Sequence, residues 1–173
     1  MTIRPAGRDD APALATLWNT FIRDTFVTFN SAEKTAAEVA ALIEARRAEG
    51  HGFLLAEDGA RLAGFATYGQ FRGGVGYART MEHTVLLAPE ARGRGVGRAL
   101  MTALESHARA AGAHSMFAGV SAANPGGVAF HAAIGYVEVA RLAEVGFKAG
   151  QWLDLVLMQK RLDAAPDSGA RLG

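Results

Sequence analysis

The chain has 173 residues and contains no cysteine. This absence excludes disulfide bonds, zinc sites built from thiolates and a cysteine nucleophile. The formal net charge is only +1, so no overall field favours nucleic acid or a membrane surface as the partner. No apolar run approaches the length that spans a bilayer, and the N-terminus lacks the apolar segment of a signal peptide. We therefore expect a cytoplasmic protein with neither nucleic acid nor membrane as its partner.

The composition is that of an ordinary globular protein. Hydrophobic residues make up 50% of the chain and charged residues 20%. The length favours a single domain and is sufficient to bury a core without covalent staples. We place this domain at residues 1–163. Residues 164–173, which include Pro166, Ser168 and Gly169, have the composition of a disordered tail.

The hydrophobic pattern predicts the order β-α-α-β-β-β-α-β-α-β-β, which is typical of a mixed α/β sheet with helices on both faces. Thr35 and Glu38 form a capping-box pattern, and Asp58-Gly59 is a hairpin signal. Glu105 and Arg109 have the spacing of an ion pair on the exposed face of a helix. Strands are expected at 2–5, 52–57, 61–68, 80–88, 115–120, 137–145 and 151–158, helices at 9–22, 35–50, 96–111 and 128–134, loops at 25–30, 72–79 and 146–150, and a turn at 124–127.

A turn rich in glycine and arginine follows the apolar run that ends at Ala88-Pro89. It reads Arg92, Gly93, Arg94, Gly95, Val96, Gly97 and Arg98, and a helical pattern begins within it. A strand, a glycine turn and a helix together present several backbone N–H groups to an anion, and the helix dipole adds positive charge. The third glycine of the dinucleotide fingerprint and the Gly-Lys-Ser/Thr of the P-loop are both missing. The alternative is a glycine-rich helix N-terminus without a ligand.

Several segments together resemble one family. The pattern Arg-x-x-Gly-x-Gly at 92–97 resembles the acyl-CoA pyrophosphate loop of the GNAT N-acetyltransferases, and Asn124 followed by Gly135-Tyr136 has the spacing of that superfamily. The segment 77–85 resembles the T-x-E-x-(S/T)-V motif of the phosphinothricin acetyltransferases, and 146–154 resembles their G-x-K-x-G-x-W-x-D motif. Within this family the chain looks closest to enzymes that acetylate methionine sulfone and methionine sulfoximine. The resemblance extends from about Ile3 to Leu162.

This resemblance implies the GNAT fold, acetyl-CoA as the co-substrate and a homodimer with the substrate site near the interface. The residues it assigns to acetyl-CoA are Val85, Leu86, Leu87, Arg92, Gly93, Arg94, Gly95, Val96, Gly97, Arg98 and Asn124. Two positions depart from the family pattern: Leu86 stands where relatives often carry an aromatic residue, and Gly127 where they often carry serine or alanine. The first departure affects the substrate wall, and the second removes a hydrogen bond to the cofactor.

Glu82 is our candidate general base. The amine of a free amino acid is mostly protonated at neutral pH, so a base must accept its proton before it attacks a thioester. The alternative is a surface carboxylate. His83 points to the other face of the strand, where it is either structural or a substrate contact. His131 occupies the place of the tyrosine that protonates the departing thiolate in many GNAT enzymes, and it is either this acid or a buried structural residue.

Arg72 and Arg79 flank a glycine-rich loop just before Glu82. A guanidinium there would pair with the carboxylate of an amino acid, and the resemblance supports Arg72, Val75, Gly76 and Tyr77 as the site for a small amine substrate. The competing interpretation is that both arginines are solvated. The remaining histidines show no metal-binding spacing, so no metal is assigned.

The sequence therefore leaves three functions to compare. The first is an N-acetyltransferase that acts on the α-amine of a small amino-acid analogue, such as phosphinothricin, methionine sulfoximine or methionine sulfone. The second is an acetyltransferase of the same fold that acts on a protein N-terminus or a lysine. The third is a module that binds acyl-CoA without turnover, which the presence of Glu82 argues against.

Overall fold

The structure is a computed structural model that describes residues 1–162. The predicted order of strands and helices is confirmed, while the predicted tail at 164–173 lies outside the described residues. Short 3-10 turns occupy Arg8–Asp10, Val75–Tyr77 and Pro89–Ala91. The main elements are β1 (Thr2–Pro5), α1 (Ala11–Asp24), α2 (Ala36–Ala48), β2 (Phe53–Asp58), β3 (Arg61–Gln70), β4 (Thr80–Leu87), α3 (Val96–Ala110), β5 (Ser115–Ser121), α4 (Pro125–Ala133), β6 (Val137–Lys148) and β7 (Gln151–Arg161).

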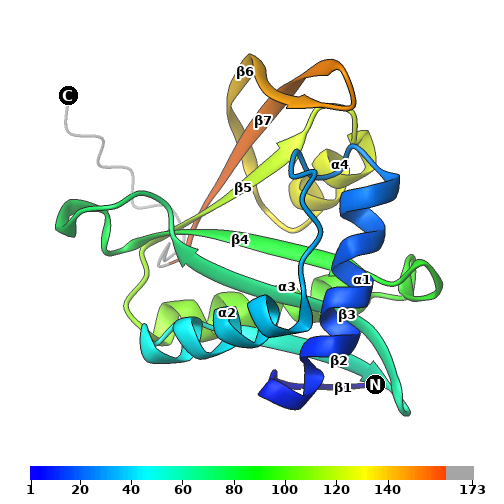
Figure 1. Cartoon of the computed structure of the whole chain (residues 1–173). Coiled ribbons are helices and arrows are strands. Elements are labelled where there is room, and N and C mark those ends of the chain that lie inside the picture. The colour runs from blue at the N-terminus through cyan, green and yellow to red at the C-terminus, as the bar shows by residue number, and fades with distance from the viewer. Residues whose placement is uncertain (163–173) are drawn as a thin grey trace.

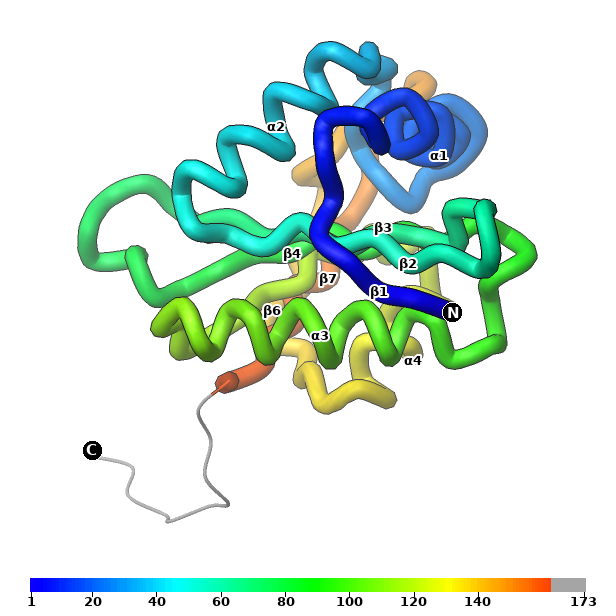
Figure 2. Tube along the Cα trace, turned by 90° about the horizontal axis from the view of Figure 1, so that it is seen from below, coloured from blue at the N-terminus to red at the C-terminus, as the bar shows by residue number. Residues whose placement is uncertain are grey.

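The seven strands form one sheet in the order β1-β2-β3-β4-β5-β7-β6. Among these strands, only β4 and β5 pair in parallel, because α3 carries the chain back between them; the other neighbours are antiparallel. Helices α1 and α2 cover one face of the sheet, and α3 and α4 cover the other (Figures 1 and 2). The predicted mixed sheet with helices on both faces is confirmed.

The two central strands separate along their length. Residues Thr80–His83 of β4 pair with Ser115–Ala118 of β5, and within residues 1–162 the pairing of these two strands ends there. The following part of β4, residues 84–87, pairs with β3, and residues 119–121 of β5 pair with β7. The sheet therefore opens between β4 and β5 toward the C-terminal ends of both strands.

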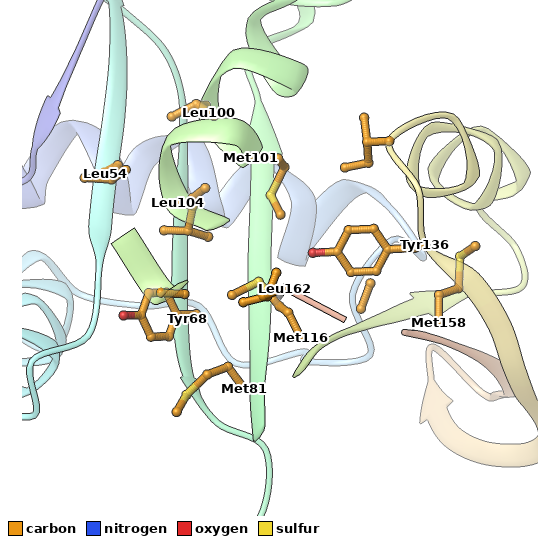
Figure 3. Close-up of a cluster of buried hydrophobic side chains, with 14 of the residues drawn as sticks. Leu54, Tyr68, Met81, Leu100, Met101, Leu104, Met116, Tyr136, Met158 and Leu162 are labelled. Atoms are coloured by element: carbon orange, nitrogen blue, oxygen red, sulfur yellow. The ribbon is translucent and has the colours of Figure 1, made fainter. Parts of the chain in front are cut away.

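Two apolar clusters hold the helices on the sheet. On the α3 face, Leu100, Met101 and Leu104 project onto the strands beside Met116 and Tyr68 (Figure 3). On the other face, the Trp18 ring of α1 lies 4.8 Å from the Phe65 ring of β3, centroid to centroid. The helical spacing of the apolar residues in α1 and α3 produces these faces, as predicted. The predicted capping box of α2 is present, with the Glu38 amide donating to Thr35 Oγ1.

Three sequence predictions about local structure are wrong. Helix α4 begins at Pro125, not at residue 128, because Asn124 caps it by accepting a hydrogen bond from the Gly127 amide at 3.0 Å. Strand β6 includes 146–148 and β7 includes all of 159–161, leaving only Ala149-Gly150 as the turn. Glu105 is buried and pairs with Lys160 at 2.6 Å, while Arg109 donates to the Leu162 carbonyl oxygen, so these two residues form no exposed pair.

Candidate active site

The loop between β4 and α3 presents a row of backbone amides. Gly93 has φ 72° and Gly95 has φ 79°, a left-handed conformation that favours glycine. Within residues 1–162, the amides of 93–95 donate no hydrogen bond to the backbone or to a side chain. The amides of residues 96–98 lie in the first turn of α3, where the helix itself provides no backbone acceptor for them. The predicted succession of strand, glycine turn and helix is therefore present, with its backbone amides free.

The three arginines of this loop have different surroundings. Arg94 forms an exposed ion pair with Asp58 at 2.7 Å, and Arg98 donates to the Ala133 carbonyl oxygen at 3.1 Å. The Arg92 guanidinium lies over the Phe21 ring, 5.7 Å from its centroid, and lines a cavity. Arg92 is therefore the arginine that faces the space beside the loop, whereas the other two are engaged elsewhere.

Two cavities meet where the sheet opens. The larger, about 430 Å³, begins at Arg92 and Gly93 of the glycine loop, and the smaller, about 290 Å³, extends toward β5 and β7. The two cavities are adjacent, because they share five lining residues: Val27, Val85, Leu86, Asn124 and His131. Together they lead from the amide row to the gap between β4 and β5.

The exposed edge of β4 faces this space. The Ala88 amide donates to the Ala63 carbonyl of β3 at 2.9 Å, so the even-numbered residues of this part of β4 direct their backbone groups toward β3. Val85 and Leu87 then direct theirs toward β5, which no longer pairs with β4 at this level. These backbone groups are free to pair with an extended ligand.

A buried lysine fixes the roof of the smaller cavity. Lys148 Nζ donates to the carbonyl oxygens of Thr25 and Thr28 at 2.6 and 2.9 Å, and the Phe29 ring packs closely against Gly146. The predicted loop at 25–30 is thus held against β6. It contributes four residues to the cavity wall, Val27, Thr28, Phe29 and Asn30.

Glu82 borders the smaller cavity. A Cβ placed on Gly119 would lie 3.0 Å from Glu82 Oε1 and 3.5 Å from Leu155, and both Gly119 and Leu155 line that cavity. Among the residues described, the Glu82 side chain has no hydrogen bond or ion pair, although solvent reaches it. Partial burial of the carboxyl group raises its pKa above the ordinary 4.5. The group is therefore a free carboxylate with increased basicity beside a ligand-sized space.

His83 and His131 lie together on the other face of β4, as predicted for His83. Their ring centroids are 5.1 Å apart, and both rings line the smaller cavity through the opening in the sheet. His131 Nδ1 donates to the Gly127 carbonyl oxygen at 2.7 Å, which leaves Nε2 as the acceptor of the neutral ring. Burial lowers the pKa of His131, and it lowers the pKa of His83 to about 3, so both rings are neutral near pH 7.

The predicted substrate residues before Glu82 lie outside both cavities. Arg72 is exposed, and its guanidinium lies 5.7 Å from the centroid of the Tyr77 ring. Val75 is 96% exposed, and a Cβ added to Gly76 would meet nothing within 4 Å. Arg79 is also exposed. The loop 72–79 extends from the ends of β3 and β4 away from the rest of the molecule (Figure 1).

The two departures from the family pattern have structural explanations. Leu86 is buried and lines both cavities. At Gly127, a side chain would collide with the Asn124 amide group that caps α4. Glycine at 127 thus permits this cap.

Sequence reasoning missed Lys34, which lines the smaller cavity, and the role of Lys148. Both residues act together with segments that are distant in sequence. Within residues 1–162, no group of three or more His, Asp or Glu side chains is arranged to hold a metal ion, and no helix is long and apolar enough to cross a membrane.

The residues fit an acyl-CoA. The amide row and Arg92 suit a diphosphate, the free edge of β4 suits an extended amide-containing arm, and the cavity beside Glu82 accommodates the reacting end. The site therefore has the donors and the space that a ligand with a diphosphate and an extended arm requires.

Comparison with known proteins identifies the class of protein. The acetyltransferase (GNAT) family model matches residues 14–136. The L-methionine sulfoximine/L-methionine sulfone acetyltransferase of Salmonella typhimurium is 35% identical, with 97% of this chain and 99% of its own covered. Phosphinothricin N-acetyltransferase of Alcaligenes faecalis is 33% identical, with 94% and 83% covered. A solved structure of a Salmonella typhimurium acetyltransferase with its cofactor acetyl-CoA has a TM-score of 0.90 and 35% identity, covering 98% of this chain and 99% of that one.

The chain belongs to the GNAT family of acetyltransferases. It is an acetyl-CoA-dependent N-acetyltransferase, and the predicted resemblance to the phosphinothricin and methionine sulfone–methionine sulfoximine acetyltransferases is confirmed.

Proposed function

We propose that this enzyme transfers the acetyl group of acetyl-CoA to the α-amine of a small amino-acid analogue of the methionine sulfone, methionine sulfoximine or phosphinothricin type. The observation that carries this proposal is the cavity of about 290 Å³ beside Glu82. Its volume suits a small molecule, and the loop at 25–30 walls it where a peptide substrate would need an open groove. The names of the relatives agree with this substrate class.

For the cofactor, we propose that residues 92–98 hold the diphosphate through their free amides and the charge of Arg92. Val85, Leu86 and Leu87 would line the pantetheine arm, and Asn124 would contact it from the start of α4. Bound acetyl-CoA supplies a thioester carbonyl that an amine attacks. The free backbone groups of β4 would orient this carbonyl and polarise it.

Glu82 is proposed as the general base. Its carboxylate accepts a proton from the substrate ammonium, and the freed nitrogen lone pair then forms the amide bond while the carbon–sulfur bond breaks. His131 is proposed to protonate the departing thiolate. Because Nδ1–H is donated to the Gly127 carbonyl oxygen, the neutral ring has no proton at Nε2, so Nε2 would first have to gain a proton and then pass it to the thiolate. Nε2 is buried and has no hydrogen-bond partner in residues 1–162. Because the pKa of His131 is lowered, only a small fraction of the rings is protonated near pH 7, but a protonated ring gives up its proton more readily than an ordinary imidazolium.

The substrate is proposed to be positioned by His83 from the cavity wall and by the exposed loop with Arg72, Val75, Gly76 and Tyr77. Arg72 would pair with an anionic group of the substrate as the loop closes on the end of β4 that carries Glu82.

A homodimer is proposed from an exposed apolar surface on β6 and β7. Phe147 is 56% exposed and Trp152 61%, and their rings lie 5.0 Å apart. Exposed apolar side chains gathered on neighbouring strands mark a contact surface. Sedimentation velocity should give the mass of a dimer for the wild type and of a monomer for Trp152→Lys. A wild-type monomer would contradict the proposal.

The function is tested by a panel of acceptors with acetyl-CoA and detection of the released thiol. We expect turnover with L-methionine sulfone, L-methionine sulfoximine or phosphinothricin. Turnover only with peptides would instead support a protein N-terminal or lysine acetyltransferase. Binding of acetyl-CoA without turnover of any acceptor would support a non-catalytic module. Because acetyl-CoA is an intracellular metabolite, we propose the cytoplasm as the site of action.

A further inference from the structure

Lys34 is held in a fixed position beside the smaller cavity. The Asn19 side chain bonds both backbone groups of Lys34: its amide nitrogen donates to the Lys34 carbonyl oxygen, and its oxygen accepts from the Lys34 amide, both at 2.8 Å. The Lys34 ammonium lies over the Trp18 ring, 4.8 Å from its centroid. The backbone and the side chain are thus both constrained, so little freedom is lost when a ligand binds.

The ammonium has no counterion among residues 1–162. None of the ion pairs within 4.0 Å in this part of the chain includes Lys34. Glu38 is near enough for the charge of Lys34 to lower its pKa slightly, but its carboxylate is occupied by the amide and hydroxyl of Thr35. Glu33 pairs with Arg23 at 3.6 Å. Lys34 therefore keeps its charge available for a ligand.

Among the residues that line the smaller cavity, Lys34 is the charged one. Seventeen residues line it, and the other two ionisable groups among them, His83 and His131, are neutral near pH 7. Glu82 borders the same cavity at Gly119 and Leu155. The space therefore lies between a carboxylate that suits an ammonium group and an ammonium that suits an oxyanion.

We propose that Lys34 determines substrate specificity by binding a negatively charged or strongly polar oxygen of the amino-acid substrate. This inference rests on the proposed function and extends it. A free amino acid of this class carries two such groups: the α-carboxylate and the oxygens on the side-chain sulfur or phosphorus. Either one is drawn to Lys34 while the amine lies at Glu82, and an acceptor without such an oxygen loses this contact.

The test compares wild type with Lys34→Met, which keeps the length of the side chain and removes the charge, and with Lys34→Arg, which keeps the charge. With L-methionine sulfone, we expect Lys34→Met to raise KM by about 10- to 100-fold, as for a lost hydrogen bond to a charged group. KM for acetyl-CoA should stay within about threefold, and Lys34→Arg should recover most of the substrate affinity. Arg47→Met, an exposed position at the far end of α2, is the control for the change in net charge.

Two further acceptors distinguish the oxygens that Lys34 binds. L-methionine sulfone amide lacks the carboxylate, and L-norleucine lacks the side-chain oxygens. If the carboxylate is bound, Lys34→Met affects norleucine and not the amide; if the sulfone is bound, the reverse holds. Either result supports the proposal.

The proposal is refuted if wild type acetylates methionine sulfone and Lys34→Met has the same KM for this acceptor. If wild type acetylates none of the amino-acid analogues, the proposed function fails and this inference fails with it. A melting temperature for each variant near that of wild type shows that the change in KM is not due to unfolding.

Discussion

Glu82→Gln is expected to lower kcat about 100- to 10,000-fold at neutral pH, which is the usual contribution of a general base. The substrate amine is mostly protonated there, and a glutamine amide cannot accept its proton. Glutamine matches the size of glutamate and leaves the neighbouring Gly119 and Leu155 undisturbed. The measurement is kcat and KM for methionine sulfone by release of thiol. Glu44→Gln, an exposed position on α2, should behave as wild type.

The pH dependence of both enzymes tests the same role. In wild type, kcat/KM should fall as the pH decreases through the pKa of Glu82, because the protonated carboxyl is no longer a base. Burial raises this pKa, so the acid limb should lie above the ordinary value of 4.5. In Glu82→Gln, this limb should disappear, and turnover should recover partly at high pH, where solvent deprotonates the amine. Full activity of the variant at neutral pH would exclude Glu82 from the mechanism.

The stability of Glu82→Gln separates this role from a structural one. A carboxyl group whose pKa is raised by folding favours the folded state at low pH, and this contribution is lost as the pH rises through the folded-state value. The ionised Glu82 is therefore a cost to folding at neutral pH. We expect the variant to melt at or slightly above the wild-type temperature at pH 7, and the difference to close below about pH 4. A markedly lower melting temperature would indicate a structural role.

The parts of this protein that could be predicted from sequence are those encoded locally. The glycine loop is one continuous segment between a strand and a helix, so its geometry follows from residues that are neighbours in the chain. The capping box of α2 needs only Thr35 and Glu38, three residues apart. The order of strands and helices follows from hydrophobic periods in the same way. The family motif singles out Asn124, and in the structure this residue caps α4.

The parts that could not be predicted depend on partners that are far apart in sequence. Lys148 reaches carbonyl groups 120 and more residues away, so its spacing within a motif does not reveal that it holds the cavity roof. The sequence predicts an exposed pair for Glu105 because it does not show that Lys160 of β7 lies beside this residue. The sequence likewise does not show that Arg94 pairs with Asp58 or that Arg98 donates to Ala133, since both partners come from other elements.

The left-handed conformation of Gly95 leads to the second large expected effect, a higher KM for acetyl-CoA when this glycine is replaced. Gly95 has φ 79° and caps α3, and an alanine there costs about 1–2 kcal/mol unless the loop changes conformation. A changed loop no longer directs its amides to one point. We expect Gly95→Ala to raise KM for acetyl-CoA about tenfold or more, the effect of losing one or two charge-assisted hydrogen bonds, with KM for methionine sulfone unchanged.

Gly50→Ala is a closely matched control for this effect. Gly50 has φ 72° after α2, and, as at Gly95, an added Cβ would meet nothing within 4 Å. Both variants therefore carry the same kind of backbone strain and should lose similar stability, but only Gly95→Ala should impair the use of acetyl-CoA. S-acetylpantetheine, which lacks the diphosphate, should be used equally well by Gly95→Ala and wild type. If Gly95→Ala impairs both acetyl donors to the same extent, the loop acts through the fold of the site and not by holding a diphosphate.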